Sequence, residues 1–288
     1  MILVVGATGQ LGGMIATSLL ARSAPVRILV RPGSEFRALV EAGAEPAVGD
    51  LKSRATLDAA CDGVDVVITT ANSALRGGAD NVDTVDIEGN RHLIDAASNA
   101  RVGQFVFVSA LGVSPDSPVP LFRAKALSEA YLRESGLPYT ILAPDAFMDV
   151  WFPMVLGPAL GGAPVTVVGT GVRKHSFVAA ADVAAFATAS VGRADALNRH
   201  VPLGGPDALS WREVIAAFER ALSREIPILS VAPGQSLPGL ADIVATLMAG
   251  LDTYDSVVPM SETARQFGVQ QTRVEDFVAG MLAAAPRP

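Results

Sequence analysis

The sequence predicts an α/β protein built on a doubly wound parallel sheet, with a smaller C-terminal lobe. Through residue 147, short apolar runs alternate with amphipathic segments, which is the order of strands and helices in such a fold. The runs are rich in β-branched residues and lack polar alternation, as expected of strands buried on both faces. The regular order stops near Met148. We therefore predict a core over residues 1–147 and a mixed α/β lobe over 148–288, part of which returns to the core.

A glycine-rich turn near the start stands between a predicted strand, residues 2–5, and a predicted helix. Its glycines are three residues apart, and a strand before them with a helix after them is the context that a dinucleotide fingerprint needs. Gly6 allows the tight turn, Gly9 lets the backbone approach a pyrophosphate, and Gly12 lets helix and strand pack closely. Amides at the helix start then bind the phosphates. The expected cofactor contacts of this turn are Gly6, Thr8, Gly9, Gln10, Leu11 and Gly12.

Arg31 directly follows the second predicted strand, residues 26–30. Many dinucleotide folds have Asp or Glu about 20 residues after the glycines, where it binds the ribose 2′-hydroxyl. A cation at this position attracts a 2′-phosphate instead, which favours NADP over NAD. The alternative is a solvated arginine at a strand end.

The other predicted strand ends supply further candidates, because open α/β sheets bind ligands at the carboxyl ends of their strands. Asp50 and Leu51 follow the third strand and are candidates for the adenine side, although Asp is nearly as often a turn former. The fourth strand, residues 64–70, ends at the same edge. The expected cofactor contacts at strand ends are Asp50, Leu51, Thr70, Ala71, Asn72, Pro144 and Phe147.

Several helix boundaries are also predicted. A short helix over 34–42 is expected to bury Phe36, Leu39 and Val40, and another helix is expected over 82–97. The predicted helix caps are Ser53, Asp182, Ser210 with Glu213, and Thr272 with Glu275.

The helix over 82–97 begins with acidic residues, Asp83, Asp86 and Glu88, which favour a wet helix start over a metal site. A further short strand is expected over 176–178. His92, His175 and His200 are scattered without metal-ligand spacing, so no metal is expected.

Composition limits the function classes. The 288 residues carry a formal net charge of −7 and show no basic cluster, so nucleic acid is not an expected partner. The single cysteine, Cys61, fits a reducing compartment and reads as a small buried apolar residue, so we expect a cytoplasmic protein. We expect neither a signal peptide nor a spanning helix, because the first strand begins at Met1 and no apolar run reaches about 18 residues. A monomer or homodimer is expected.

Together these stretches resemble the NmrA-like, atypical branch of the short-chain dehydrogenase/reductases. The matching motifs are GATGQLG, VRP, GDL, VSALG, K-x-x-x-E, SGLPYTIL, FVAAADVAAFA, GGPDALSWREV, TARQFGV and VEDFV, in that order along nearly the whole chain. The resemblance implies an NAD(P)-binding Rossmann core and a variable substrate lobe. It matches Ser109 to the serine at the fifth strand end, and Lys125 to the lysine of the Y-x-x-x-K helix.

Two positions depart from that family pattern. The tyrosine position, four residues before Lys125, is Leu121, and Ala143 replaces the arginine of a common L-R-P sequence. The usual proton donor is therefore missing. Lys125 is expected to orient the nicotinamide ribose, with donation to substrate and a solvated pairing with Glu129 as alternatives. Ser109 is expected to contact a substrate carbonyl, although a serine at a strand end also commonly forms a turn.

Two functions are consistent with these residues. The first is an NADPH-dependent reductase of a small, fairly apolar conjugated acceptor, such as a quinone or enone. The second is a non-catalytic NADP-sensing regulator, since some relatives in this branch are regulators. The absence of a G-x-S-x-G elbow argues against a hydrolase. The expected substrate contacts are Ser109, Asp145, Met148, Trp151 and Phe152, with core packing as the alternative for the aromatic residues.

Overall fold

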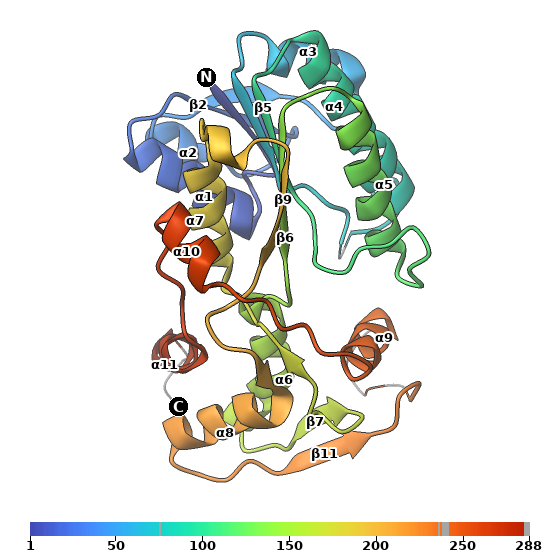
Figure 1. Ribbon diagram of the computed structural model, residues 1–288, viewed down its shortest axis with the longest axis vertical. Helices are drawn as coiled ribbons and strands as arrows, with labels where there is room; N and C mark the ends of the chain where they lie inside the picture. Colours follow the sequence, from blue (N-terminus) through green and yellow to red (C-terminus); the bar gives the residue numbers. More distant parts are fainter. Residues whose placement is uncertain (75, 236, 238–241, 285–288) are drawn as a thin grey trace. The chain divides into compact units, whose positions relative to one another are not determined.

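A computed structural model describes residues 1–74, 76–235, 237 and 242–284 (Figure 1). The chain forms two compact units. Unit 1 comprises Met1–Pro144 and Val183–Pro202, and unit 2 comprises Asp145–Asp182 and Leu203–Pro288. The first change of unit falls close to residue 147, where the sequence predicts the end of the core, and a later segment returns to unit 1. The predicted domain functions stay predictions.

The main sheet has the strand order β3-β2-β1-β4-β5-β6-β9, and the pairings from β3 through β6 are parallel. The strands are β1 (Ile2–Val5), β2 (Val26–Val30), β3 (Glu45–Val48), β4 (Val66–Thr69), β5 (Gln104–Val108), β6 (Tyr139–Pro144) and β9 (Arg199–Leu203). The strand order reverses between β1 and β4, which is the switch point where open α/β sheets bind ligands. The predicted Rossmann-type doubly wound fold is confirmed.

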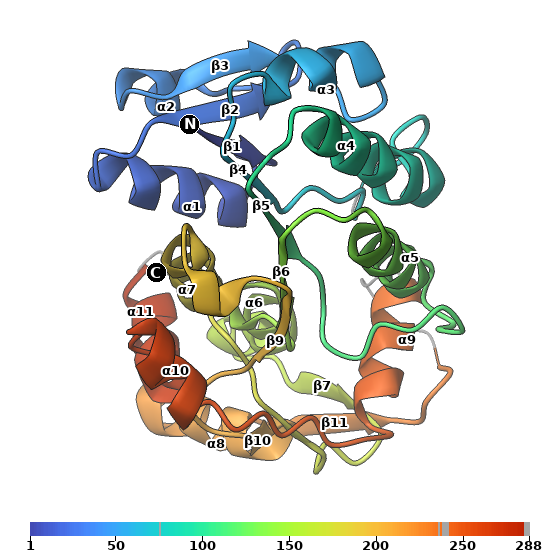
Figure 2. The same ribbon diagram turned by 45° about the horizontal axis from the view of Figure 1, so that its top comes forward.

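Helices cover both faces of this sheet. Figure 2 shows α1 and α2 against one face and α3, α4 and α5 against the other. The helical elements are α1 (Gln10–Ala21), α2 (Arg37–Glu41), α3 (Arg54–Cys61), η1 (Val82–Ile87), α4 (Glu88–Asn99), α5 (Pro120–Glu134), α7 (Ala180–Ser190) and η2 (Ala194–Ala196). Two-sided cover explains why β1, β4 and β5 are buried at every position and carry no polar alternation.

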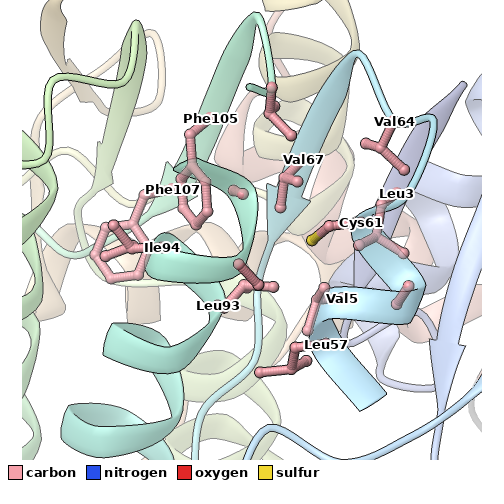
Figure 3. Close-up of a cluster of buried hydrophobic side chains, with 14 of the residues drawn as sticks. Leu3, Val5, Leu57, Cys61, Val64, Val67, Leu93, Ile94, Phe105 and Phe107 are labelled. Carbon is pink, nitrogen blue, oxygen red and sulfur yellow. The ribbon is translucent and has the colours of Figure 1, made fainter. Parts of the chain in front are cut away.

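One hydrophobic cluster fills the space between the sheet and the α3–α4 face. Figure 3 shows Leu3 and Val67 from the sheet packed against Leu57 and Leu93 from the helices, with Cys61 among them. Cys61 is completely buried, as its interpretation as a small apolar core residue predicts, and burial raises the pKa of its thiol to about 11.

The predicted helix over 34–42 is wrong in extent and in burial. Only Arg37–Glu41 is helical, and none of its residues is buried. Phe36 and Leu39 are half-buried and Val40 is 38% exposed, so they do not form the expected inner face. The element directly precedes β3, an edge strand with no buried residue, so there is little core to cover.

The predicted helix over 82–97 begins instead with a π-helical turn, η1, and continues as α4. The Asn81 side chain accepts from the amides of Asp83 and Thr84 and caps this turn. Asp83 and Glu88 are exposed as expected, but Asp86 is only 1% exposed. The expectation of a wet acidic start is therefore wrong for Asp86, whose buried carboxylate accepts from the amide and the hydroxyl of Ser73.

Unit 2 is organised around an aromatic core in which Phe152, Phe177 and Trp211 pack in tilted and edge-on pairs. Strands β7 and β11 pair in parallel, and β8 and β10 pair antiparallel. The elements are α6 (Met148–Leu160), β7 (Val165–Val168), β8 (Lys174–His175), β10 (Leu209–Ser210), α8 (Trp211–Leu222), β11 (Ile228–Val231), α9 (Asp242–Leu251), α10 (Ser261–Phe267) and α11 (Val274–Ala284).

Helix starts test the predicted caps. Ser210 and Glu213 form the expected capping box of α8. Ser53 occupies the N-cap position of α3 but makes no side-chain cap hydrogen bond. Asp182 does not cap a helix, because α7 already begins at Ala180, and its carboxylate instead accepts from the amide and hydroxyl of Thr272.

Two further expectations in unit 2 are corrected. Because α11 begins at Val274 and Thr272 donates to Asp182, the predicted capping box of Thr272 and Glu275 does not form. The strand expected over 176–178 lies earlier, at Lys174–His175, and Val178 forms only an isolated bridge with Phe147. In the part of the chain that the structure describes, no helix is both long and apolar enough for a membrane span.

We expect the Cys61 thiol to be unreactive toward a water-soluble disulfide reagent in the native protein, because the side chain is fully buried and its pKa is raised. Modification should follow the unfolded fraction across a urea titration. The measurement is the modification rate beside the circular dichroism transition. Rapid stoichiometric labelling in the absence of denaturant would contradict the packing described.

Candidate functional site

The glycine turn after β1 depends on very close backbone packing. Gly6 has φ +91°, in the left-handed region, and its carbonyl accepts from the Gly9 amide at 3.0 Å. A Cβ on Gly12 would lie 2.1 Å from that same Gly6 carbonyl oxygen. A Cβ on Gly9 would meet only this oxygen, at an ordinary 3.4 Å. The Gly12 position is therefore closed by the fold, whereas the Gly9 position faces open space.

The N-terminus of α1 is available for an anion. Gly9 is the N-cap residue, and no side chain among the described residues caps the helix. Thr8, Gly9 and Gln10 are exposed, and Leu11 is half-buried. Amides of a first helical turn attract negative charge when no side chain satisfies them. This cradle fits the pyrophosphate of a dinucleotide.

The ends of β1 and β4 meet at the switch point of the sheet. A Cβ on Gly6 would lie 2.6 Å from Thr70 Oγ1 and 3.1 Å from the Ala71 amide nitrogen. The Thr70 amide donates to the Val5 carbonyl at 3.0 Å. The Asn72 carboxamide oxygen accepts from the Ala74 amide and shapes the turn that follows. The structure thus brings Gly6, Thr70 and Ala71 together.

The ends of β2 and β3 carry the charged groups of the expected adenosine side. The Arg31 guanidinium donates to the Asp80 carboxylate, which also pairs with Lys52. Asp50 accepts from the Lys52 amide at 2.8 Å, as its interpretation as a turn former predicts. The Leu51 side chain packs in the hydrophobic cluster of unit 1. Lys52 and Asp80 were not predicted as site residues. The only sequence feature that pointed to Lys52 was its place a few residues after the end of the third strand.

Ser109 and Lys125 meet at the carboxyl end of β5. Ser109 is the first residue after that strand, and Lys125 Nζ donates to the carbonyl of the preceding residue, Val108, at 2.9 Å. The ammonium also lies over the Phe107 ring, 5.2 Å from its centroid. Lys125 is only 8% exposed, so the alternative of a solvated lysine paired with Glu129 is wrong.

Burial changes the acid–base properties of this corner. It lowers the pKa of Lys125 to about 8, although the nearby carboxylates of Asp86 and Glu129 oppose the shift. Burial also raises the pKa of Asp86, against hydrogen bonds donated by the Ser73 amide and hydroxyl. Asp86 additionally accepts, through its backbone carbonyl, from Ser128 on α5. The π-helical turn therefore joins the segment after β4 to the helix that carries Lys125.

The buried Glu129 and the more exposed His200 lie at the same corner, and neither was among the predicted site residues. Burial raises the pKa of Glu129, but interactions with His200, Ser109 and Arg133 outweigh burial and leave the pKa below its ordinary value. His200 Nε2 lies 3.7 Å from Glu129 Oε1, and its side chain is 37% exposed. No hydrogen bond of good geometry within the described residues reaches Ser109 Oγ or Glu129 Oε1. The buried Ser109 hydroxyl thus lies near Glu129 without a hydrogen bond of good geometry, which leaves it suited to receive a ligand.

The remaining predicted contacts occupy β6 and unit 2. Pro144 ends β6, and its carbonyl accepts from the Leu111 amide at 2.8 Å. In unit 2, Phe147 is the half-buried N-cap residue of α6, and the buried Asp145 carboxylate accepts from the Ser176 amide and the Ser256 hydroxyl. Met148 and Phe152 are completely buried, and Trp151 packs against the same core.

This burial favours core packing for Met148 and Phe152. The assignment of all these positions to cofactor or substrate stays a prediction. Within the described part of the chain, no group of three His, Cys, Asp or Glu side chains is placed to hold a metal ion.

A Rossmann-type sheet with an uncapped glycine turn at its switch point defines a dinucleotide-binding protein. The sequence pattern of the family described as NAD(P)H-binding matches residues 6–194. The chain is 33% identical to the NAD(P)H azoreductase of Xenophilus azovorans over 288 residues, covering 100% of this chain and 92% of that protein. It is also 34% identical to a photosystem II assembly factor of Cyanophora paradoxa, over 80% of this chain and 71% of that protein.

Solved structures share the fold. The NADPH complex of quinone oxidoreductase QOR2 from Escherichia coli superposes with a TM-score of 0.84 at 23% identity, covering 98% of this chain and 100% of that chain. The triphenylmethane reductase of Citrobacter sp., complexed with NADP(H), gives 0.81 at 18% identity, covering 98% and 99%. The chain therefore belongs to the NAD(P)H-binding family, in the NmrA-like branch that its motifs predict, and is an oxidoreductase of that family.

The two glycines of the turn should respond differently to substitution. We expect Gly9→Val to keep the thermal stability of the parent but to lose NADPH binding, because the side chain enters the space of the pyrophosphate. Gly12→Val should destabilise the fold itself, since its Cβ would overlap the Gly6 carbonyl. Differential scanning fluorimetry and cofactor titration separate the two effects. A folded Gly9→Val protein with parental NADPH affinity would disprove the assignment.

Lys125 should lower the stability of the free protein at neutral pH. Burial lowers its pKa in the folded state to about 8, below the ordinary lysine value of 10.5, so the folded state disfavours the ammonium. This destabilisation is fully present below about pH 8 and disappears as pH rises toward 10.5. We expect Lys125→Met to raise the free energy of unfolding at pH 7 by about 1–3 kcal/mol, and by less at pH 9.5.

Urea denaturation at the two pH values tests this expectation, with the exposed Lys174→Met as the control. The control should change the free energy of unfolding by no more than about 0.5 kcal/mol. A Lys125→Met protein that is less stable than the parent at pH 7 would show that the ammonium stabilises the fold.

Proposed function

We propose that the protein is an NADPH-dependent reductase of a small, fairly apolar conjugated acceptor, working by hydride transfer without the usual catalytic tyrosine. The observation that carries this proposal is the buried Lys125 ammonium beside Ser109 at the carboxyl end of β5. A lysine that is buried and has its pKa lowered by that burial is explained most simply by a role with a ligand. Its position in a protein of the NAD(P)H-binding family supports the nicotinamide side of the cofactor as that ligand.

Different residues of unit 1 are proposed to bind different parts of the cofactor. In this proposal the α1 N-terminus binds the pyrophosphate, and Thr70, Ala71 and Asn72 line the path beyond it. Asp50 and Leu51 contact the adenine side, and Arg31 binds the 2′-phosphate. Lys125 donates to the ribose hydroxyls and thereby fixes the ring, with its ammonium held in place by the Val108 carbonyl. When bound, NADPH supplies the hydride.

Ser109 is proposed to donate to a carbonyl or similar acceptor atom. Its hydroxyl is buried, lies close enough to Glu129 to lower the pKa of that carboxylate, and has no hydrogen bond of good geometry among the described protein groups. Leu121 cannot donate a proton, and a positioned general acid contributes about 10²–10⁴ in rate. The site should therefore favour acceptors that are easily reduced, such as quinones, enones or azo compounds, over simple ketones.

Unit 2 is proposed to supply the specificity for the acceptor. Phe147 and Trp151 are half-buried, and together with Asp145 they remain the proposed contacts of unit 2. The completely buried Met148 and Phe152 would not touch the acceptor, but would support Phe147 and Trp151 from within the core of unit 2. Azo compounds are proposed as acceptors because a relative aligned over the whole chain is an NAD(P)H azoreductase.

The alternative, a non-catalytic NADP-sensing protein, has a parallel among relatives that are described as assembly factors. No feature of the described residues favours it over a reductase. A cytoplasmic location is proposed on the basis of the single buried thiol.

The decisive experiment is NADPH oxidation with a panel of quinones, enones, azo dyes and simple ketones. We expect turnover with at least one of the first three classes and none with the ketones. Gly9→Val should abolish turnover, and Lys125→Met should weaken both NADPH binding and single-turnover reduction. If no acceptor is reduced although NADPH binds tightly to the parent, the sensing alternative replaces the proposal. If Lys125→Met leaves binding intact while reduction collapses, Lys125 acts as a proton donor.

A further inference from the structure

Asp80 lies at the centre of a cluster of cations. Its carboxylate accepts hydrogen bonds from Arg31 and Lys52, and Arg76 Nη1 is 3.6 Å from its Oδ2 atom. The hydrogen bond from Lys52 lowers the pKa of Asp80, burial opposes that effect, and the hydrogen bond from Arg31 lowers it further. The Asp80 side chain is 19% exposed, whereas the cations around it are 33–42% exposed. The acid is therefore more enclosed than its partners.

These cations come from three separate segments. Arg31 follows β2, Lys52 follows β3, and Arg76 belongs to the segment after β4. Asp50 is the nearest other acid, 3.7 Å from Lys52 Nζ. Three cations against two carboxylates leave an excess of one positive charge at a strand edge. Such a cluster matches a phosphate dianion, which offers several acceptor oxygens to Arg and Lys, better than it matches a single carboxylate.

We propose that Asp80 is a built-in competitor of the cofactor's 2′-phosphate and thereby limits the preference for NADPH over NADH. This inference rests on the proposed assignment of Arg31 to the 2′-phosphate. In the free protein, the Asp80 carboxylate holds Arg31 and Lys52 together. Binding of NADPH replaces that carboxylate with the 2′-phosphate on the same donors, whereas NADH, which lacks the phosphate, leaves the Asp80 contacts intact. Asp80 thus weakens NADPH binding selectively and is a specificity-determining residue.

The test compares full-length Asp80→Asn with the parent by isothermal titration of NADPH, NADH and adenosine 2′-monophosphate. Removing the competing charge should tighten NADPH and adenosine 2′-monophosphate about five- to ten-fold and change NADH by less than about two-fold. Asp83→Asn is the matched control, because it removes the same charge from an exposed residue three positions away. It should change all three affinities by less than about two-fold. Asp80→Glu, which keeps the competing charge, should resemble the parent.

The outcomes separate this inference from the assignment of Arg31. Unchanged or weaker NADPH binding by Asp80→Asn would overturn the competition, and an equal gain for NADPH and NADH would reduce it to a general charge effect and overturn it as well. If the parent shows no preference for NADPH, or if Arg31→Ala keeps that preference, the proposed 2′-phosphate site falls and the inference falls with it. A gain in Asp80→Asn that disappears in the Arg31→Ala background supports both.

Discussion

The packing of Gly12 against the Gly6 carbonyl is the constraint on which the rest of the cofactor site depends. No side chain fits between the two residues, so the turn after β1 fixes the position at which α1 begins. That position brings the uncapped amides of its first turn to the end of β1, beside Thr70 at the end of β4. The strand order places this junction at the switch point of the sheet. Because Gly6 and Gly12 have no Cβ, the start of α1 lies against the ends of β1 and β4. The exposed residue Gly9 is at the same place.

A second constraint is electrostatic and lies at the end of β5. Lys125 is buried near two acids, Asp86 and Glu129. The two carboxylates raise the pKa of Lys125, and Lys125 in turn lowers the pKa of Asp86. Burial dominates for Lys125 and Asp86, whereas the surrounding polar groups dominate for Glu129. The result is a corner that contains ionisable groups of both signs. Functional sites commonly retain such groups at the expense of stability.

Much of the fold follows from local sequence, and the reason is visible in particular elements. The apolar runs of β1, β4 and β5 are buried on both faces, so a short β-branched run without polar alternation is enough to identify them. The glycine turn is equally local, because all three glycines act within one turn and one helix start. The short helix α2 was mispredicted because Phe36, Leu39 and Val40 are apolar yet face little core.

The parts of the site that escaped prediction depend on contacts between distant segments. Asp80 meets Arg31 and Lys52 only in the folded sheet, and no spacing in the sequence announces that meeting. His200 reaches Glu129 because β9, which carries His200, adds to the sheet beside β6, although Glu129 lies far from β9 in sequence. Asp86 lies in a π-helical turn and is bound by Ser73, in the segment after β4. Periodicity and motif spacing describe neighbours along the chain, and these residues become neighbours only through the topology.

The interrupted course of unit 1 has a consequence for how the protein is made. Strand β6 ends at Pro144, but its outer neighbour β9 begins only at Arg199, after the chain has passed through Asp145–Asp182 of unit 2. At a synthesis rate of about 5–20 residues per second, the ribosome needs roughly 3–11 seconds to deliver the missing strand. During that interval β6 is an open, apolar sheet edge of the kind that promotes aggregation. The nascent chain must therefore protect this edge until the strand that carries His200 arrives.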